Sequence, residues 1–237
     1  AGDHYLAKQG KTSGIPEKER VHTAVLSLGL SELADFEPGL KVIEYRYAGE
    51  PSGLVAMTLR EFSDELSSSS PAPGGGSVAA LCGALSASLT AMVAALTWSK
   101  SGFELARPGM RAIGMEAQSL KDVFLTAVDR DTEAFNAVLA AMRLPKKTPE
   151  DIAARAGAVE HANLGAARVP LNVLEATIRA LELALRAASD GNPNSVSDAG
   201  VAGAVALAAA EGAALNVRIN APSLVDRSVA QEFLARQ

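Results

Sequence analysis

The sequence predicts an all-α protein, an up-and-down helical bundle preceded by a short N-terminal arm that contains one strand. Hydrophobic residues make up 48% of the 237 residues and aromatic residues only 4%. Because this apolar fraction consists mostly of alanine, leucine and valine, it favours closely packed helices over a β-sandwich. From Ser77 onward the apolar residues recur with a helical period. The helical segments are separated by breaks rich in proline or asparagine, as expected of such a bundle.

Residues 1–50 differ from the rest and are expected to be the end of another domain. Two short helices are predicted, and the second begins after Pro16 and ends at Gly29. The segment KVIEYRY, Lys41–Tyr47, alternates in polarity and is rich in β-forming residues, so it is the strand candidate. Because one strand cannot form a sheet by itself, it is expected to pair elsewhere or to belong to a further domain.

Residues 51–57 are expected to be a linker, and residues 58–237 the helical domain. Thr58 is a good N-cap for a helix over TLREFSDEL, and the run SSSSPAPGGG ends that helix. No repeat of fixed period is evident. The remaining helices are expected at 77–100, 109–142, 149–167, 171–189, 197–219 and 223–236.

Charge and cysteine usage narrow the class of protein. The net charge of −5 and the pI of about 5.3 give no basic field, so neither nucleic acid nor an anionic membrane is an expected partner. Cys82 is the single cysteine, lies among small apolar residues and is expected to be a buried structural thiol. The N-terminus lacks a secretory pattern, so a cytoplasmic location is expected. No histidine pair has the spacing of a metal site.

The segment PAPGGGSVAALCGALSASLTAMV, Pro71–Val93, is open to several interpretations. A phosphate-binding P-loop is disfavoured because no lysine follows the last glycine. A membrane span would have the right length, but its alanines and hydroxyl residues make it weakly hydrophobic. The glycines can instead expose the N–H groups of a central helix to an anionic or carbonyl-bearing ligand. A flexible linker into a core helix is the remaining alternative.

Asp131 lies on the apolar side of a predicted helix. Phe124, Val128, Phe135 and Leu139 form one stripe at helical spacing, and Asp131 falls inside it. A carboxylate there is costly unless it is paired, and desolvation raises its pKa. Such residues mark either a functional site or a buried ion pair. The neighbouring Asp129 and Glu133 are expected to be solvated surface charges.

Other polar residues interrupt the helical pattern at positions suited to a ligand or to the structure. Arg143, Lys146 and Lys147 form a small basic cluster that suits carboxylates, although lysines at helix ends are common. Asp198 is a ligand candidate or a helix cap. Asn216 and Asn220 share a helix face, where a ligand and a structural network are equally plausible.

Taken together, these motifs resemble the cyclodeaminase family. This family comprises the C-terminal half of glutamate formiminotransferase–formimidoyltetrahydrofolate cyclodeaminase and its stand-alone relatives. The similarity covers about 58–237, and the N-terminal GIPEKERVHTAVLSLGLSELADFEPGLKVIEYRY resembles the end of the formiminotransferase half. Because the rest of that half is not in the chain, formiminotransferase activity is not expected. The matching pieces are APGGGSVAA, VDRDTEAFNAVLAAMRLPKKTPE, VPLNVLEAT, SDAGVA and GAALNVRIN.

The resemblance implies a helical protein that forms a homodimer or a larger homo-oligomer, and that converts 5-formimidoyltetrahydrofolate to 5,10-methenyltetrahydrofolate and ammonia in histidine degradation. N10 of the folate attacks the amidine carbon, a five-membered ring closes, and ammonia leaves. One carboxylate of raised pKa can serve as base and then as acid, and Asp131 matches the family's catalytic aspartate. No metal or nucleotide cofactor is implied, because an amidinium is already electrophilic.

The resemblance also suggests roles for the remaining candidates and leaves two rival functions. Backbone donors at Gly75, Gly76 and Ser77 would face the folate. Arg143 and Lys146 would bind its glutamate tail, which is expected to be polyglutamylated. Asp198, Asn216 and Asn220 would contact the pterin edges. The rivals are methenyltetrahydrofolate cyclohydrolase activity, which opens the same ring with water, and a non-catalytic folate-binding or dimerisation module. The carboxylate at Asp131 argues against the module.

Overall fold

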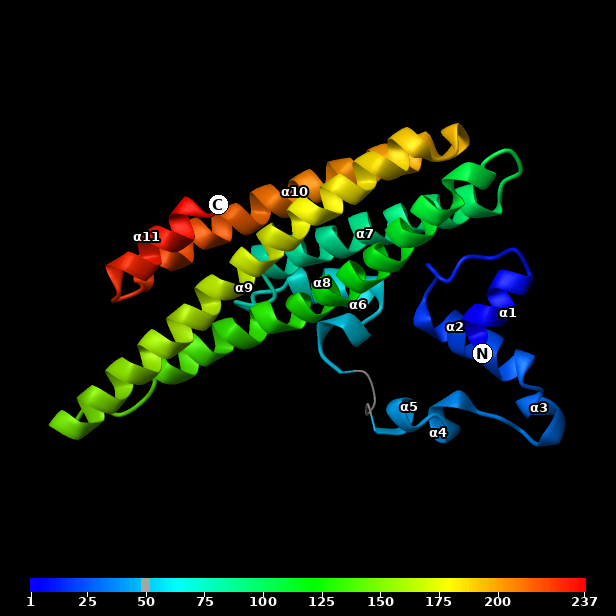
Figure 1. The fold of residues 1–237 in the computed structure, drawn as a ribbon. Coiled ribbons are helices and arrows are strands. Elements are labelled where there is room, and N and C mark those ends of the chain that lie inside the picture. The colour runs from blue at the N-terminus through cyan, green and yellow to red at the C-terminus, as the bar shows by residue number, and fades with distance from the viewer. Residues whose placement is uncertain (48–51) are drawn as a thin grey trace. The chain divides into compact units, whose positions relative to one another are not determined.

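The computed structural model describes residues 1–47 and 52–237, and every regular element in this part of the chain is a helix. The all-α fold predicted from the sequence is confirmed. Figure 1 shows the order of the elements along the chain. They are α1 (Gly2–Lys8), α2 (Glu17–Ser27), α3 (Leu30–Leu33), α4 (Pro38–Lys41), α5 (Ile43–Tyr47), the 3-10 helix η1 (Leu54–Ala56), α6 (Leu59–Leu66), α7 (Gly75–Ser99), η2 (Glu104–Ala106), α8 (Arg107–Met142), α9 (Pro149–Asp190), η3 (Pro193–Ser195), α10 (Val196–Asn220), η4 (Ala221–Ser223) and α11 (Arg227–Ala235).

The chain forms two compact units, each assembled from separate stretches of sequence because the long helices pass from one unit into the other. Unit 1 comprises Ala1–Ser52, Leu85–Lys121 and Ala180–Ala204. Unit 2 comprises Gly53–Ala84, Asp122–Arg179 and Val205–Gln237. Each unit has its own hydrophobic cluster, so each is described separately below.

In unit 1 the N-terminal segment packs on α8 through small residues. The core contains Met110, Ile113 and Leu183, all at most 1% exposed. A side chain on Gly14 would lie 2.8 Å from the backbone of Gly114, so the two backbones pack directly against each other. This contact explains why glycine occupies both positions.

The prediction of a strand at Lys41–Tyr47 is wrong. The described residues there form the short helices α4 and α5. Glu37 caps α4 by accepting a hydrogen bond from the Gly39 N–H, and Pro38 occupies the first helical position, where its missing N–H is harmless. Because no second strand is present in the described residues, β-propensity had no ladder to stabilise it and local capping decided the conformation.

Unit 2 is held together by close helix packing and by its C-terminal hairpin. Phe124 is fully buried on α8, and a side chain on Gly83 of α7 would lie 2.6 Å from its ring. The C-terminal helix α11 folds back beside the end of α10 (Figure 1), and Leu171, Val217 and Phe233 share one buried cluster. The helix predicted after Thr58 is present as α6, with a capping box between Thr58 and Glu61.

The prediction that a helix ends before Pro170 is also wrong, because α9 runs without interruption from Pro149 to Asp190. Proline lacks an N–H, so the Ala166 carbonyl four residues earlier loses its helical donor. The side-chain amide of Asn220 at the end of α10 supplies the missing hydrogen bond, with Nδ2 donating to the Ala166 oxygen at 2.9 Å. A contact far away in sequence therefore allows the helix to continue.

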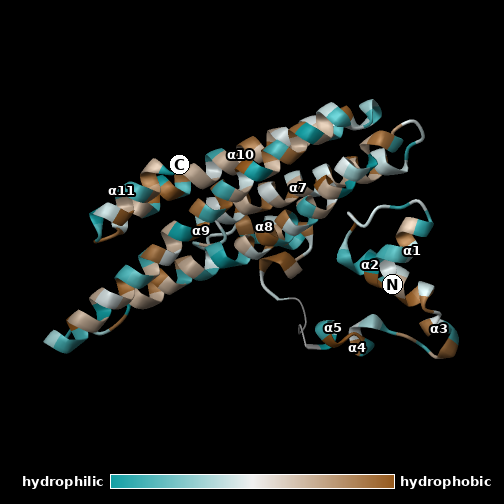
Figure 2. Cartoon of the chain, in the orientation of Figure 1, coloured by the Kyte–Doolittle hydropathy of each residue, from teal (hydrophilic) through white to brown (hydrophobic). Residues whose placement is uncertain are grey.

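Two stretches of the described chain, Gly75–Ser99 and Pro193–Ser223, are long and apolar enough to cross a membrane. The most apolar window of the first is 56% buried within the protein, as expected of a core helix, whereas that of the second is 28% buried. Figure 2 shows α7 in white and brown along its length, in keeping with its lack of charged residues. Its small side chains let neighbouring helices approach closely.

Candidate active site

Unit 2 contains a cavity of about 380 Å³, within the range of small-molecule sites. It lies where the glycine turn before α7 meets α8, α9 and α10. Both polar and apolar side chains line it, and Asp131 is the one acidic or basic side chain among the described residues that do so. The lining residues are Pro71, Ala72, Gly74, Gly75, Gly76, Asp131, Phe135, Val138, Met142, Asn163, Ala166, Asn216, Ile219, Asn220 and Ser223.

The glycines place the backbone of the first turn of α7 directly at the cavity. The helix begins at Gly75, and its initial N–H groups have no acceptor within the helix. A Cβ atom on Gly76 would lie 2.1 Å from Oδ1 of Asp131, so only glycine allows this carboxylate to approach the helix start. The positive end of the helix dipole faces the same point. The glycine stretch is therefore part of the site and not a simple linker.

Asp131 reaches the cavity from the middle of α8. Val128, one turn earlier, and Phe124, two turns earlier, are fully buried, whereas Phe135, one turn later, is 37% exposed. Asp131 thus stands where the apolar stripe passes from the core to the cavity wall. Burial raises the pKa of its carboxyl, and hydrogen bonds from the Ser77 side chain and backbone lower that pKa part of the way. A carboxyl of raised pKa is suited to exchanging protons near neutral pH.

Ser77 is buried beneath the carboxylate. Its hydroxyl lies 3.1 Å from Oδ2 of Asp131 and 3.0 Å from the carbonyl oxygen of Val128. The sequence predicted a backbone contact from Ser77 to a ligand. In the structure the side chain is fully buried and contacts the carboxylate, so Ser77 lies behind the reacting surface.

The wall formed by α8 is apolar. Phe135, Val138 and Met142 lie on one face of the helix at three- and four-residue spacing and line the cavity. Phe135 and Met142 are large hydrophobic residues that remain exposed. Such a wall can cover the face of a flat heteroaromatic ring, while the polar lining groups form hydrogen bonds with the edge of the ring.

Three asparagines line the opposite side. Asn216 donates to the Gly212 carbonyl of its own helix at 2.8 Å, Asn220 donates to Ala166 as described above, and Asn163 donates to the Ser223 carbonyl at 3.1 Å. Each contact uses a side-chain nitrogen as donor. The amide oxygens are acceptors, which suits ligand N–H groups.

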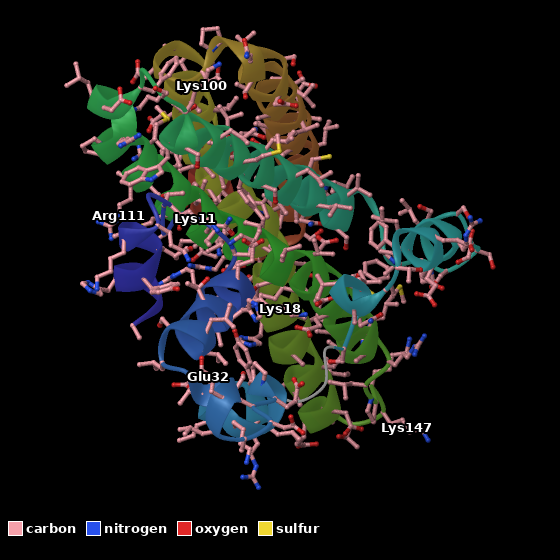
Figure 3. All side chains as sticks on the ribbon, turned by 90° about the vertical axis from the view of Figure 1, so that its right-hand side faces the viewer. Lys11, Lys18, Glu32, Lys100, Arg111 and Lys147 are labelled. Atoms are coloured by element: carbon pink, nitrogen blue, oxygen red, sulfur yellow. The ribbon has the colours of Figure 1, made fainter. Side chains whose placement is uncertain are left out.

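Four further candidates from the sequence do not line this cavity. Arg143 and Lys146 are exposed and follow directly after Met142, at its rim. Lys147 is exposed in the same loop and points outward in Figure 3. Asp198 lies in the first turn of α10 and belongs to unit 1.

Two other expectations are corrected. Asp129 is half-buried rather than solvated, because its Oδ1 accepts a hydrogen bond of 2.6 Å from the Leu54 N–H within the expected linker, of which Pro51 lies outside the described residues. Cys82 is only partly buried, and desolvation raises the pKa of its thiol, which keeps it protonated. No group of three metal-ligating side chains occurs in the described residues.

Sequence reasoning missed several lining residues, notably Asn163, Ala166 and Met142. A signal was present for Asn163, a polar residue in the run VEHANLG, but its partner Ser223 lies 60 residues away. A larger cavity, of about 1030 Å³, lies within the N-terminal segment among α1, α2, α4 and α5. Lys11 and Lys18, labelled in Figure 3, line it together with Glu19 and Glu37. It lacks a half-buried carboxylate like Asp131, so the smaller cavity is the candidate site.

The fold and the cavity define an all-α protein with a cavity of small-molecule size around one partly buried carboxyl. Residues 58–237 match the family model described as formiminotransferase-cyclodeaminase, and residues 1–48 match the formiminotransferase domain. The chain belongs to the formiminotransferase-cyclodeaminase family.

Three relatives illustrate this membership. The chain is 40% identical over 177 residues to a methenyltetrahydrofolate cyclohydrolase of Methylorubrum extorquens, covering 75% of this chain and 85% of the relative. It is 38% identical over 215 residues to the formimidoyltransferase-cyclodeaminase of Sus scrofa, covering 90% of this chain and 40% of the relative. The crystal structure of formiminotetrahydrofolate cyclodeaminase from Thermotoga maritima superimposes with a TM-score of 0.69 at 28% identity, covering 76% of this chain and 86% of that one.

Proposed function

We propose that the chain is a cyclodeaminase that converts 5-formimidoyltetrahydrofolate to 5,10-methenyltetrahydrofolate and ammonia. The observation that carries the proposal is the half-buried Asp131 carboxylate, the one titratable group among the described residues that line a cavity of small-molecule size. The names of the relatives supply the substrate class. The chain spans about 40% of the length of the formimidoyltransferase-cyclodeaminases it matches, so the proposal concerns only the cyclodeaminase step.

The reaction needs a single group that first accepts and then donates a proton. N10 attacks the amidinium carbon, and Asp131 takes the N10 proton as the new C–N bond forms. The protonated Asp131 then gives this proton to the amino group of the tetrahedral intermediate, and the C–N bond to that group breaks to release ammonia. A carboxyl of raised pKa suits both steps because the two protonation states are close in free energy.

The surrounding residues would bind the folate around this carboxyl. We propose that Phe135 and Met142 cover one face of the ring system, while the Asn216 amide oxygen and the N–H groups at Gly75 and Gly76 contact its polar edge. Arg143 and Lys146 at the rim would attract the glutamate tail, which carries several carboxylates when it is polyglutamylated.

The direct test supplies chemically synthesised 5-formimidoyltetrahydrofolate and follows formation of the methenyl product by its near-ultraviolet absorbance. We expect turnover by the wild type and a loss of about 100-fold or more in kcat for Asp131→Asn, as for loss of a general acid–base residue. Glu133→Gln is the matched control, because Glu133 is an exposed carboxylate two residues away on the same helix. Full activity of Asp131→Asn would overturn the assignment.

The cyclohydrolase relative supports a second candidate, hydrolysis of 5,10-methenyltetrahydrofolate. In this reaction Asp131 would take a proton from the attacking water instead of from N10. The same absorbance distinguishes the two, since the cyclohydrolase consumes the methenyl compound. Faster loss of added methenyltetrahydrofolate than its formation from the formimidoyl substrate would favour the second candidate.

We also propose that the protein is a homodimer that acts in the cytosol in histidine degradation. Leu207 and Leu215 lie on α10 in unit 2 and are 54% and 61% exposed, which supports an apolar contact with a second copy. We expect Leu215→Lys to lower the sedimentation coefficient to that of a monomer, while Glu211→Gln leaves it unchanged. A wild type that sediments as a monomer at micromolar concentration would contradict the dimer.

A further inference from the structure

The hydroxyl of Ser77 has more acceptors than it has protons. Its Oγ lies 3.0 Å from the Val128 carbonyl, 3.1 Å from Oδ2 of Asp131 and 3.3 Å from Oγ1 of Thr132. A serine hydroxyl donates one hydrogen bond. The ionised carboxylate is the strongest of these acceptors, because a charge-assisted hydrogen bond is about twice as strong as a neutral one. The proton of Ser77 therefore belongs to Asp131 while the carboxylate is charged.

The two oxygens of the carboxylate have different surroundings. Oδ2 faces the fully buried Ser77. Both oxygens lie near Gly76, which lines the cavity, but Oδ1 is the nearer: a Cβ atom there would be 2.1 Å from Oδ1 and 2.7 Å from Oδ2. The Ser77 hydroxyl thus bonds Oδ2, the Ser77 backbone N–H also bonds the carboxylate, and Oδ1 lies nearer to the residue that lines the cavity.

We propose that Ser77 is a positioning residue that holds Oδ2 of Asp131 and thereby assigns proton exchange with the substrate to Oδ1. The inference rests on the proposed function and deepens it. When the carboxylate accepts a proton, Oδ2 keeps its bond to Ser77, so the new O–H forms on Oδ1 beside the cavity. That proton is then aimed at the departing amino group instead of into the core.

Neutral Asp131 also leaves Ser77 with a satisfactory partner. Once Oδ1 is protonated, Oδ2 is a neutral acceptor comparable to the Val128 carbonyl, so the hydroxyl can donate to either at little cost. Ser77 is thereby hydrogen-bonded in both protonation states. An unpaired buried hydroxyl would otherwise penalise one of them.

Burial is the largest influence on the pKa of Asp131, and the hydrogen bonds from Ser77 oppose it. No other charged side chain lines the cavity in the described residues. The segment before α7 carries no ionisable group between Ser67 and Gly74. The nearest ionisable side chains on α7, α8, α9 and α10 all lie outside the lining; they are Cys82, Asp129, Arg130, Glu133, His161, Arg168, Glu211 and Arg218.

The test is Ser77→Ala, assayed as the pH dependence of kcat/KM and by carbon-13 NMR titration of Asp131 in the free protein. Loss of a donor to the charged form moves the midpoint of both curves to higher pH, because the ionised carboxylate becomes less stable. We expect kcat to fall about tenfold, the value of one hydrogen bond to a charged group. Ser77→Thr keeps the hydroxyl and should restore the wild-type midpoint.

Thr132→Val is the matched control, since the Thr132 hydroxyl contacts the Ser77 hydroxyl at 3.3 Å, and its curves should match the wild type. If Ser77→Ala fails to fold, Ser77→Cys, with a weak donor of similar size, should show the same upward shift. Unchanged or lowered midpoints in the substituted protein would overturn the inference. Because the NMR titration needs no substrate, this result is distinct from inactive wild type, which would overturn the proposed function instead.

Discussion

At the scale of single residues, Gly76 and Asp131 depend on each other. The carboxylate occupies the space where any side chain at position 76 would begin, at 2.1 Å from Oδ1. Glycine is therefore required at this position by contact rather than by backbone conformation, since Gly76 is not among the glycines with positive φ. A sequence motif of three glycines thus reflects the approach of a residue from a different helix.

Gly76→Ala is expected to displace Asp131 by about 1 Å and to lower kcat/KM about 100-fold, because misplacement of a reacting group by this distance has such an effect. The measurement is steady-state turnover of the formimidoyl substrate. Gly165→Ala on α9 is the control, since a Cβ atom there meets nothing within 4 Å, and it should retain activity. Wild-type activity of Gly76→Ala would mean that the carboxylate contact is not needed.

Asp131→Asn is expected to stabilise the protein at neutral pH. Burial raises the folded-state pKa of Asp131, so the unfolded chain loses this proton first as the pH rises. Below the ordinary pKa of aspartate both states are protonated and the carboxyl costs nothing. Stability falls between that ordinary value and the raised folded-state value, and the cost persists at higher pH.

Urea unfolding of the wild type and Asp131→Asn over a pH series checks this expectation. The difference in unfolding free energy should grow in favour of the asparagine variant as the pH rises through this window. Glu133→Gln should show no comparable trend, because Glu133 is exposed. A difference that shrinks with rising pH would contradict a raised pKa.

At the scale of elements, the continuity of α9 depends on a contact from α10. Pro170 deprives the Ala166 carbonyl of its donor, and the Asn220 amide replaces it. Both Ala166 and Asn220 line the cavity, so this hydrogen bond also fixes the α9 wall relative to α10 within unit 2. A side chain expected to touch the ligand thus has a structural role as well.

A double-mutant cycle tests this link. Asn220→Ala should lower the unfolding free energy by about 1 kcal/mol, because a partly buried acceptor loses its partner. In a Pro170→Ala background the new N–H donates to Ala166, so the same substitution should cost clearly less. The measurement is chemical denaturation of all four proteins. Equal costs in the two backgrounds would show that Asn220 does not replace the missing donor.

At the scale of the whole molecule, the two units have separate cores, and the candidate site is lined only by residues of unit 2. In unit 1 the N-terminal segment contacts the long helices through Gly14 on Gly114, and Trp98 donates to the Gly10 carbonyl at 2.8 Å. Trp98 is the single tryptophan of the chain, so it reports on this contact.

Gly14→Ala is expected to weaken this contact by about 1 to 3 kcal/mol, because the added methyl group meets backbone that cannot give way. The fluorescence of Trp98 should shift to longer wavelength and residues 1–47 should be cleaved faster by protease. Gly109→Ala is the control, because a Cβ atom there has open space. An unchanged Trp98 spectrum would mean that the N-terminal segment tolerates the methyl group.

The sequence alone was sufficient to predict most of the helices of the bundle and to single out Asp131 as a carboxylate on an apolar helix face. Helical periodicity and capping residues are local, so the boundaries of α6, α7, α8 and α10 fell within about two residues of expectation, and the apolar stripe of α8 exposed the carboxylate as anomalous. The expected break at Pro170 did not occur because a distant group, the Asn220 amide, supplies the missing hydrogen bond to α9. The Lys41–Tyr47 strand did not form among the described residues for another reason, because no second strand there could pair with it.

The tertiary structure alone decided which of the candidates meet. It joined Gly75, Gly76, Asp131, Asn216 and Asn220 in one cavity, with Ser77 directly behind Asp131, and left Arg143, Lys146 and Asp198 outside its lining. It also distinguished the two oxygens of Asp131, with Oδ2 on the Ser77 hydroxyl and Oδ1 nearer to Gly76. The physical reason is that periodicity fixes the direction of a side chain from its own helix, whereas hydrogen-bond partners and burial depend on neighbouring helices that are remote in sequence.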